Sequence, residues 1–244
     1  GSRSRHGIAS LHGGHTHRVA VKQADALAEV LGRFNRRWPA DASSWETLLS
    51  QARRSRLLGR LGLLVLDGLL DPPSDLPSGA RAQLASANLV SARLAVRQEA
   101  EAERLAAVLT RAGHRALLLK GAAYLCAKLP PARGRLFGDF DILVPQADLP
   151  AVESCLMAGG WISMERDAYN QRYYRQWMHE IPPLTHVRRG STVDVHHTIA
   201  PPTSAFAVDG ALLLAAARPV GDGSRFWVLQ PVDMVLHSAV HLMS

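Results

Sequence analysis

Between Ala80 and Ala112 the sequence contains neither glycine nor proline. Alanine, leucine, arginine and glutamate dominate this stretch, and all four have high helix propensity. Three prolines interrupt residues 71–77 before it, and Gly113 follows it. Breakers on both sides predict one long helix from about Ser78 to Ala112, with Gly113 as its C-cap. The pattern of apolar and polar residues changes after this helix.

The first part of the chain is predicted to be helical. Residues 1–17 are rich in glycine, serine and histidine without periodicity, and we interpret them as a flexible N-terminal arm. Residues 18–112 form a helical N-terminal region, since apolar residues recur there at steps of three and four. Ser43 or Ser44 is the expected N-cap of one helix, with Glu46 completing a capping box.

Residues 113–230 alternate short apolar runs with helical patterns, which predicts an α/β core with a mixed sheet and flanking helices. A β-hairpin is expected near the end of this core, with residues 188–191 as its turn. Residues 231–244 begin a C-terminal helical region, and we expect the natural protein to continue beyond it. The expected strands cover residues 115–119, 139–144, 161–164, 179–187, 192–198 and 226–229, and the expected helices cover residues 122–129, 148–159 and 211–217.

Composition limits the class of protein. The chain has 244 residues, of which 47% are hydrophobic and 20% charged, and this excludes wholesale disorder. The longest apolar stretch, Leu61–Leu70, is interrupted by Asp67 and is too short to span a bilayer, so no membrane association is expected. Two cysteines cannot form a disulfide framework, and we expect a cytoplasmic protein.

The net charge of +7 is unevenly distributed. Residues 1–120 contain 18 basic and 10 acidic side chains, whereas residues 121–244 contain 10 and 11. A basic surface in the first half is compatible with binding of nucleic acid or a nucleotide. The interpretation that we favour is a solvated, arginine-rich helical face.

Three aspartates are the leading candidates for chemistry. Asp139 and Asp141 flank Phe140 on a predicted strand, so both carboxylates project from one face, about 6–7 Å apart. Mg²⁺ binds through one or two such carboxylates together with substrate phosphates. Asp194 lies between Val193 and Val195, and a buried aspartate needs a partner or a metal ion. The alternative for the first pair is a solvated strand end.

The residues Lys120 and Gly121 join the expected strand at 115–119 to the next helix. A glycine there lets a phosphate approach the backbone, and the lysine adds a positive charge. An ordinary strand-to-helix turn would have the same sequence.

The sequence resembles the uncharacterised nucleotidyltransferase family of the DNA polymerase β-like superfamily. Four segments carry the resemblance: LLLKGAAYL at 117–125, RGRLFGDFDILV at 133–144, HEIPPL at 179–184 and VDVHH at 193–197. With the helical segment WETLLSQARRSRLLGRLGLLVL at 45–66, the similarity covers about residues 40–242. It implies a polymerase β-like nucleotidyltransferase sheet and an enzyme that uses Mg²⁺, or Mn²⁺, and an NTP such as ATP.

The resemblance also implies roles for individual residues. Asp139 and Asp141 would hold the metal ions that bridge the nucleotide phosphates, and Asp194 would bind the catalytic metal and assist the acceptor hydroxyl. Lys120 and Gly121 occupy the place where the wider superfamily has a Gly-Ser pair, so the serine hydroxyl is absent.

Arg135 matches an arginine in the family's loop and would face phosphate. The implied reaction moves a nucleoside monophosphate to a hydroxyl or phosphate acceptor and releases pyrophosphate. The acceptor, a peptide, a sugar or another small molecule, is left open. The alternatives are a catalytically degenerate nucleotide-binding regulatory module and a nucleic-acid-binding protein.

Histidines and aromatic residues complete the set of candidates. His179-Glu180 and His196-His197 lie on the two arms of the expected hairpin. We expect His179 or His196 to flank the carboxylates and to bind phosphate or acceptor. The alternatives are a zinc site and a structural histidine. An aromatic stripe with interleaved arginines occupies residues 169–177. Packing of one helix face is the favoured interpretation, and stacking on a base or acceptor is the other.

Overall fold

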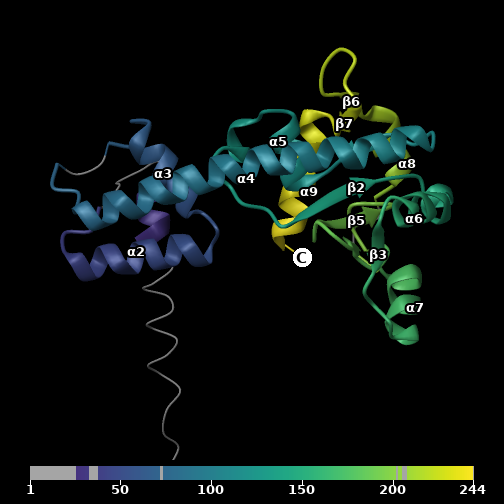
Figure 1. Cartoon of the computed structure of the whole chain (residues 1–244), viewed down its shortest axis with the longest axis horizontal. Coiled ribbons are helices and arrows are strands. Elements are labelled where there is room, and N and C mark those ends of the chain that lie inside the picture. The colour runs from purple at the N-terminus through teal and green to yellow at the C-terminus, as the bar shows by residue number, and fades with distance from the viewer. Residues whose placement is uncertain (1–25, 33–37, 72–73, 202, 205–207, 244) are drawn as a thin grey trace, which may run out of the picture. The chain divides into compact units, whose positions relative to one another are not determined.

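The computed structural model describes residues 26–32, 38–71, 74–201, 203–204 and 208–243. The arm expected at residues 1–17 lies outside these residues. Spatial clustering divides the chain into two compact units, residues 1–89 and 90–244, with the boundary inside the long helix α4, Ser78–Arg111. The boundary predicted at residue 112 stays a prediction. Figure 1 labels the elements of both units.

The described part of the N-terminal unit consists of helices. A short helical segment at 26–31 precedes α2 (Ala42–Arg54) and α3 (Leu58–Leu66), and the unit ends in the first turns of α4. Their buried side chains form one apolar core that includes Trp45, Leu48, Leu61 and Leu84. The prediction that Ser43 or Ser44 is the N-cap of α2 was wrong by two residues or more.

Asp41, and neither serine, is the N-cap of α2. Its carboxylate accepts a hydrogen bond from the Ser44 backbone N–H at 2.8 Å and from the Ser44 hydroxyl at 2.9 Å. Aspartate is as good an N-cap as serine, so two neighbouring candidates of equal merit cannot be separated by pattern alone.

The long helix is confirmed. α4 begins at Ser78 and ends at Arg111, and Gly113 follows it with φ +83°. The His114 N–H donates to the Leu109 carbonyl at 2.9 Å, so the chain turns sharply back after the helix. This turn brings the next segment directly into the sheet.

The C-terminal unit contains a seven-stranded mixed sheet, in the order β3-β4-β5-β2-β1-β7-β6. The expected α/β class with flanking helices is therefore confirmed. β2 pairs in parallel with β5 and antiparallel with β1, so β2 lies in the middle of the sheet. The predicted hairpin is confirmed as β4 and β5, which pair antiparallel. The strands are β1 Ala116–Leu118, β2 Asp139–Leu143, β3 Trp161–Ser163, β4 Leu184–His186, β5 Thr192–His196, β6 Arg218–Pro219 and β7 Phe226–Val228.

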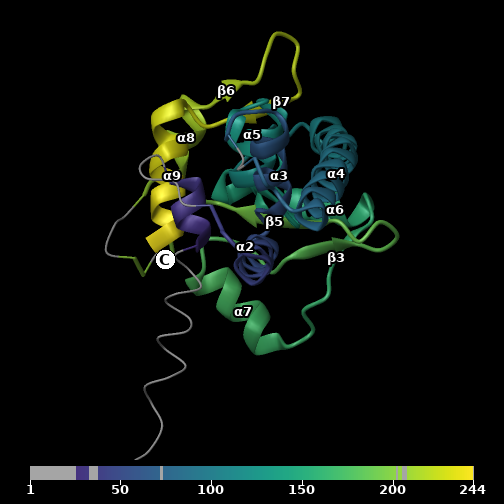
Figure 2. The ribbon, with the colours of Figure 1, turned by 90° about the vertical axis from the view of Figure 1, so that its left-hand side faces the viewer.

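Helices cover both faces of this sheet (Figure 2). One face packs on α4 and α6 (Leu149–Ala158), through Phe140 and Ile142 of β2. The opposite face packs on α8 (Gly210–Ala216), through Leu143. The alternation of side chains along β2 therefore divides two apolar cores, and it leaves Asp139 and Asp141 on the α8 side.

Three further helical elements complete the unit. They are α5 (Lys120–Cys126), α7 (Ala168–Trp177) and α9 (Pro231–Met243), with short 3₁₀ turns at Pro130–Ala132 and Gln146–Asp148. α5 starts two residues earlier than expected, because Lys120 and Gly121 belong to its first turn. A side-chain hydrogen bond between Tyr124 and Ser238 joins α5 to α9.

Candidate functional site

The paired strands β2 and β5 bring the predicted carboxylates together. They run parallel in a register that sets Asp141 opposite Asp194, and Asp139 opposite Thr192. Residues opposite each other in adjacent strands project from the same face of a sheet, so Asp141 and Asp194 are neighbours. Asp139 lies two residues before Asp141, on the same face, and is exposed at the start of β2.

Asp141 is buried, and one of its two carboxylate oxygens has two partners. Its Oδ1 accepts from Lys120 Nζ at 2.7 Å and from His196 Nε2 at 2.9 Å, and the residue is 3% exposed. Burial alone would raise the pKa of this carboxyl. The hydrogen bond and charge of His196, together with Lys120, outweigh burial and bring the pKa down to about 2. Asp141 is therefore ionised throughout the physiological range.

Asp194 has the opposite environment. Its Oδ1 is buried without any hydrogen-bond partner among the described residues. Burial raises its pKa to about 7, and the negative charges of Asp141, Glu180 and Asp139 add to the rise. An orphaned carboxylate oxygen next to an ionised carboxylate is what a hard divalent cation would satisfy, since such ions prefer oxygen ligands. The donor set of this face therefore fits the predicted metal ion.

Two histidines and a glutamate border the carboxylates. His196 Nε2 lies 3.3 Å from Glu180 Oε2 as well as 2.9 Å from Asp141 Oδ1, so this nitrogen carries the proton that both carboxylates accept. His179 stands beside them, with its ring centroid 5.1 Å from that of His196. Burial lowers the pKa of His179 to about 4, and the nearby charges of His196 and Lys120 lower it further, so His179 is neutral at pH 7.

These three side chains also form a potential metal-binding group. One ligand atom from each of His179, Glu180 and His196 lies within 4.8 Å of the others. The two histidines, predicted to flank the carboxylates, are thus placed there. A zinc ion at this group would need a fourth ligand and would compete with the proton that links His196 to Asp141.

Lys120 adopts a left-handed backbone conformation, with φ +46°. This region is unfavourable for a residue with a Cβ, and such strain concentrates at functional positions. The Leu119 N–H donates to the Asp141 carbonyl at 2.8 Å, which places Lys120 directly beside the carboxylate that it pairs with. Gly121 packs against Phe137, whose ring atoms would lie 2.8 Å from a Cβ at this position. The close contact with Phe137 therefore explains why residue 121 is a glycine, without any role for a ligand.

Arg135 lies exposed in the loop before β2, and its role at phosphate stays a prediction. Its charge reaches α9, where it contributes to the lowered pKa of His241, although burial of His241 is the main cause.

His237 of α9 is a further residue near the site that the sequence does not mark. Burial lowers its pKa to about 4, and the charges of Lys120 and His196 lower it further. A periodic helix at the end of the chain gave no sign that one of its histidines would lie close to the carboxylates, because the position of α9 depends on contacts between distant segments.

Three of the four aromatic side chains on α7 are exposed and Tyr174 is half-buried, so the favoured interpretation, packing of the whole aromatic face, was wrong. Tyr169, Tyr173 and Trp177 are 72%, 45% and 55% exposed, and no residue of α7 is buried. Tyr169 and Tyr173 stack with ring centroids 6.5 Å apart. The aspartate at 167 caps the helix by accepting from two backbone N–H groups. Rings at this spacing offer a stacking surface to a ligand.

A family model described as "Uncharacterised nucleotidyltransferase" matches residues 41–244. The chain belongs to this family. The match spans the carboxylates of β2 and β5, the residues Lys120 and Gly121, and the histidines around them. No curated protein and no solved structure gives a significant match. The membership of the uncharacterised nucleotidyltransferase family supports nucleotidyl transfer as the general activity.

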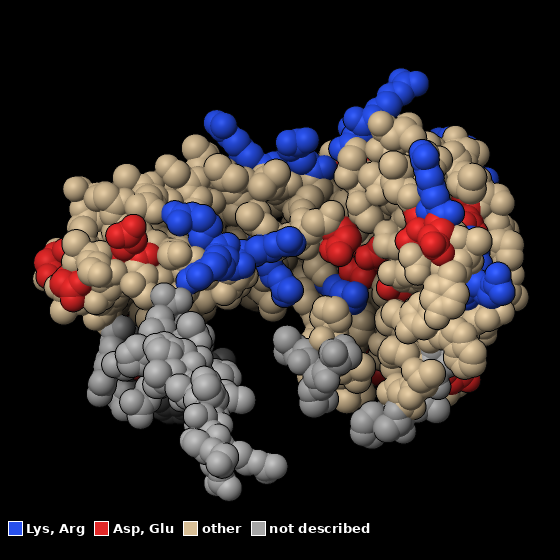
Figure 3. All heavy atoms as spheres, turned by 90° about the horizontal axis from the view of Figure 1, so that it is seen from below, with Lys and Arg blue, Asp and Glu red and all other residues tan. Residues whose placement is uncertain are grey.

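Two further observations concern membrane-spanning helices and the distribution of surface charge. Among the helices that the structure describes, none combines the length and the apolar character needed to cross a bilayer. On the face shown in Figure 3, lysine and arginine side chains stand in several separate groups, and aspartate and glutamate side chains lie beside some of them.

Proposed function

We propose that the protein is a Mg²⁺- or Mn²⁺-dependent nucleotidyltransferase that moves a nucleoside monophosphate from an NTP, such as ATP, to a hydroxyl or phosphate acceptor. The acceptor oxygen forms a bond to the α-phosphorus, the bond from that phosphorus to the β-phosphate oxygen breaks, and pyrophosphate leaves. Family membership supports the class of reaction. The metal dependence and the assignment of residues rest on the site.

The orphaned carboxylate of Asp194 is the observation that carries the proposal. Its oxygen is buried without a partner and lies opposite the ionised Asp141. A buried polar group without a partner costs free energy, and a buried charge costs more. A cluster that served only the fold would gain from a neutral side chain at position 194, whereas a cluster that binds a cation needs the carboxylate.

The residues of this chain would divide the work as follows. Asp139, Asp141 and Asp194 would hold the divalent ions, which supply charge neutralisation to the triphosphate and to the leaving pyrophosphate. Asp194 would also accept the proton of the acceptor hydroxyl, the role that the family resemblance implies for it. His196 orients Asp141 through its Nε2 proton.

Two basic residues would assist with the phosphates. Lys120 pairs with Asp141 in the structure, and its side chain is 24% exposed, so its ammonium can be shared with an incoming phosphate. Arg135 has an exposed position on the loop that leads into β2. His179 is neutral and can donate or accept a hydrogen bond at a phosphate or acceptor oxygen.

The test measures pyrophosphate release from each of the four NTPs with Mg²⁺, in the presence of candidate hydroxyl and phosphate acceptors. Wild-type protein is compared with Asp194→Asn, Asp139→Ala and a matched control, Asp222→Asn, which changes an exposed aspartate outside the site. We expect release to fall by at least about 100-fold in the first two variants, as for loss of a metal ligand or general base, and to be unchanged in the control.

Calorimetry with ATP and Mg²⁺ separates the alternatives. Binding that depends on Asp194 without any pyrophosphate release would favour the degenerate nucleotide-binding module. Neither binding nor release, with all variants behaving like wild type, would refute the nucleotidyltransferase assignment. Steeply salt-dependent binding of RNA or DNA in that case would favour the nucleic-acid-binding alternative.

A further inference from the structure

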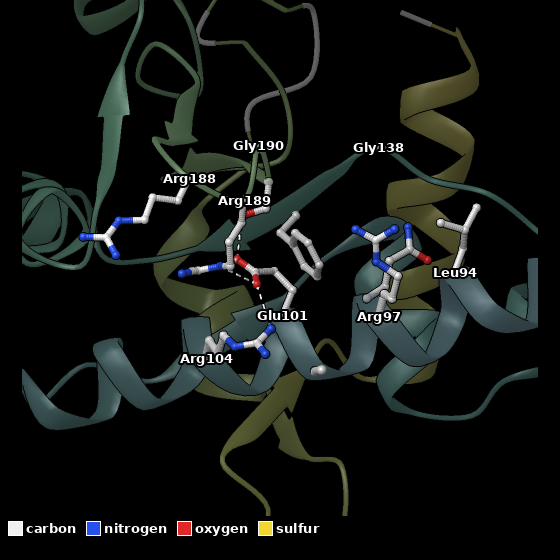
Figure 4. Close-up of a pocket in the computed structure, with 12 residues that line it drawn as sticks. Leu94, Arg97, Glu101, Arg104, Gly138, Arg188, Arg189 and Gly190 are labelled. Atoms are coloured by element: carbon white, nitrogen blue, oxygen red, sulfur yellow. Dashed lines mark hydrogen bonds and ion pairs between the residues drawn. The ribbon is translucent and has the colours of Figure 1, made fainter.

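A groove lined by arginines lies on the opposite face of the sheet from the three carboxylates. Its volume is about 690 Å³, and its walls are the middle of α4, the first residues of β2 and the turn between β4 and β5. Figure 4 shows Arg97 and Arg104 rising from α4 on the side that faces Arg189 of the turn. Arg188 also lines the groove, and its side chain extends away from the others (Figure 4).

One buried carboxylate organises the arginines. Glu101 is 7% exposed, and both of its oxygens lie 2.8 Å from Arg189 Nε. It also accepts from Ser191 Oγ at 2.6 Å and from Arg104 Nη1 at 3.1 Å. Burial would raise the pKa of this carboxyl, but the bonds from Ser191 and Arg189 outweigh it and the pKa is lowered. Glu101 is thus an ionised anchor on the floor of the groove.

Glu101 does not engage all of the guanidinium N–H donors in the groove. Glu101 contacts Arg189 only through Nε, and the guanidinium lies 4.9 Å from the centre of the Trp161 ring, so its orientation is fixed. Among the described residues, no hydrogen bond or ion pair engages the side chain of Arg97, or the two Nη atoms of Arg189. Four arginines against one glutamate leave the groove with three net positive charges.

We propose that this groove binds the phosphate of a small phosphomonoester, at a site separate from the triphosphate of the nucleotide. Planar guanidinium groups donate pairs of hydrogen bonds to phosphate oxygens, and a fixed orientation lowers the entropy lost on binding. The volume lies within the range of small-molecule sites and exceeds what one phosphate fills, so the ligand carries more than the phosphate group.

The groove lies across the sheet from the proposed metal site. Gly138 and Phe140 line it, and they are the two neighbours of Asp139 in the chain. Because successive residues of a strand project from opposite faces of the sheet, Asp139 belongs to the other face. A phosphomonoester bound at Arg97 and Arg189 is therefore a ligand distinct from the nucleotide, and its binding does not depend on the nucleotidyltransferase activity.

The experiment is calorimetry of the full chain with glucose 6-phosphate and with glucose, at low ionic strength because exposed charges are screened by salt. We expect binding of the phosphate ester and none of glucose. Arg97→Gln removes a guanidinium without breaking a described contact, and it should weaken binding about tenfold, as for loss of one charge-assisted hydrogen bond. Arg111→Gln, at the exposed end of the same helix and outside the groove, is the matched control and should leave binding unchanged.

A second titration, with ATP and Mg²⁺, separates this proposal from the proposed function. Arg97→Gln should leave ATP binding unchanged, Asp194→Asn should weaken it, and saturation with ATP should not prevent glucose 6-phosphate from binding. Absence of glucose 6-phosphate binding, equal effects of Arg97→Gln and Arg111→Gln, or competition between the two ligands would overturn the groove assignment. If ATP does not bind while glucose 6-phosphate binds as expected, the result counts against the nucleotidyltransferase assignment and leaves the groove assignment standing.

Discussion

Replacing Asp194 by asparagine should stabilise the metal-free protein at alkaline pH. The carboxyl at this position has a pKa of about 7 in the folded chain, against an ordinary value of 3.8. A raised carboxyl pKa means that folding favours the protonated form. Its contribution to stability is fully present below the unfolded pKa and is lost as pH rises through 7. Above pH 7, wild type bears a buried negative charge that the asparagine variant lacks.

The magnitude follows from the size of the shift. A rise of about three pKa units corresponds to about 4 kcal/mol, at 1.36 kcal/mol per unit. Because solvent still reaches part of the side chain, this is a ceiling, and about 2 kcal/mol is a realistic gain. For a domain of this size, 1 kcal/mol shifts the melting temperature by about 2–4 °C, so Asp194→Asn should raise it by about 4–8 °C at pH 8.

The assay is a thermal melt of the full chain with EDTA at pH 8 and at pH 5. The gain should be full at pH 8 and smaller at pH 5, where the folded carboxyl is protonated but the unfolded one is already ionised; about two fifths of it should remain there, because pH 5 lies above the ordinary value of 3.8. The pKa values of His179 and His237, both about 4, make a contribution of the opposite sign that is lost as pH falls, but it is common to both proteins and cancels in the difference.

Two results would refute this reasoning. One is an Asp194→Asn variant no more stable than wild type at pH 8; the other is a gain of equal size at both pH values. We also expect Mg²⁺ at pH 8 to reverse the order of the two melting temperatures. The ion should stabilise wild type, which retains the Asp194 carboxylate, more than the asparagine variant. Asp222→Asn serves as the control, and its melting temperature should follow wild type under all conditions.

Three more substitutions test the packing and the charges. Gly121→Ala should lower stability by about 1–3 kcal/mol in urea unfolding, because its Cβ would lie 2.8 Å from Phe137 ring atoms; full stability would show that the ring moves at no cost. Lys120→Met should raise the pKa of Asp141 from about 2, measured by carboxyl NMR titration, since it removes a positive charge 2.7 Å away; an unchanged pKa would show that the histidine contact is sufficient. Glu101→Gln should cost about 1–3 kcal/mol, because it leaves two guanidinium groups without their carboxylate, and a stability within 0.5 kcal/mol of wild type would contradict the anchor.

Local rules were sufficient for much of the fold. The helix Ser78–Arg111 follows from a run of strong helix formers between breakers, and β2 follows from its alternation. The hairpin follows from a turn with Gly190, whose φ is +68°. These features depend on neighbours in the chain, so pattern determines them.

The features that pattern could not determine depend on distant contacts. The order of the strands sets β2 beside β5, and only this order places Asp141 opposite Asp194. The anchor of the groove joins Glu101 to Arg189, which are 88 residues apart. In α7 the spacing of the aromatic residues is that of one helical face, but burial of that face depends on what packs against it, and the sequence carries no signal of that.

The two strand-paired aspartates illustrate how one face of a sheet can hold both a satisfied and an unsatisfied carboxylate. Asp141 is ionised because Lys120 and His196 compensate its charge, and it thereby makes ionisation of Asp194 harder. On the proposed function, a cation entering this pair would meet one carboxylate oxygen already hydrogen-bonded and one without a partner. Asp194 would therefore be the first ligand that the ion gains, and Asp141 would become available when Lys120 pairs with phosphate instead. We therefore expect the metal ion and the nucleotide to bind cooperatively, each lowering the cost of the other.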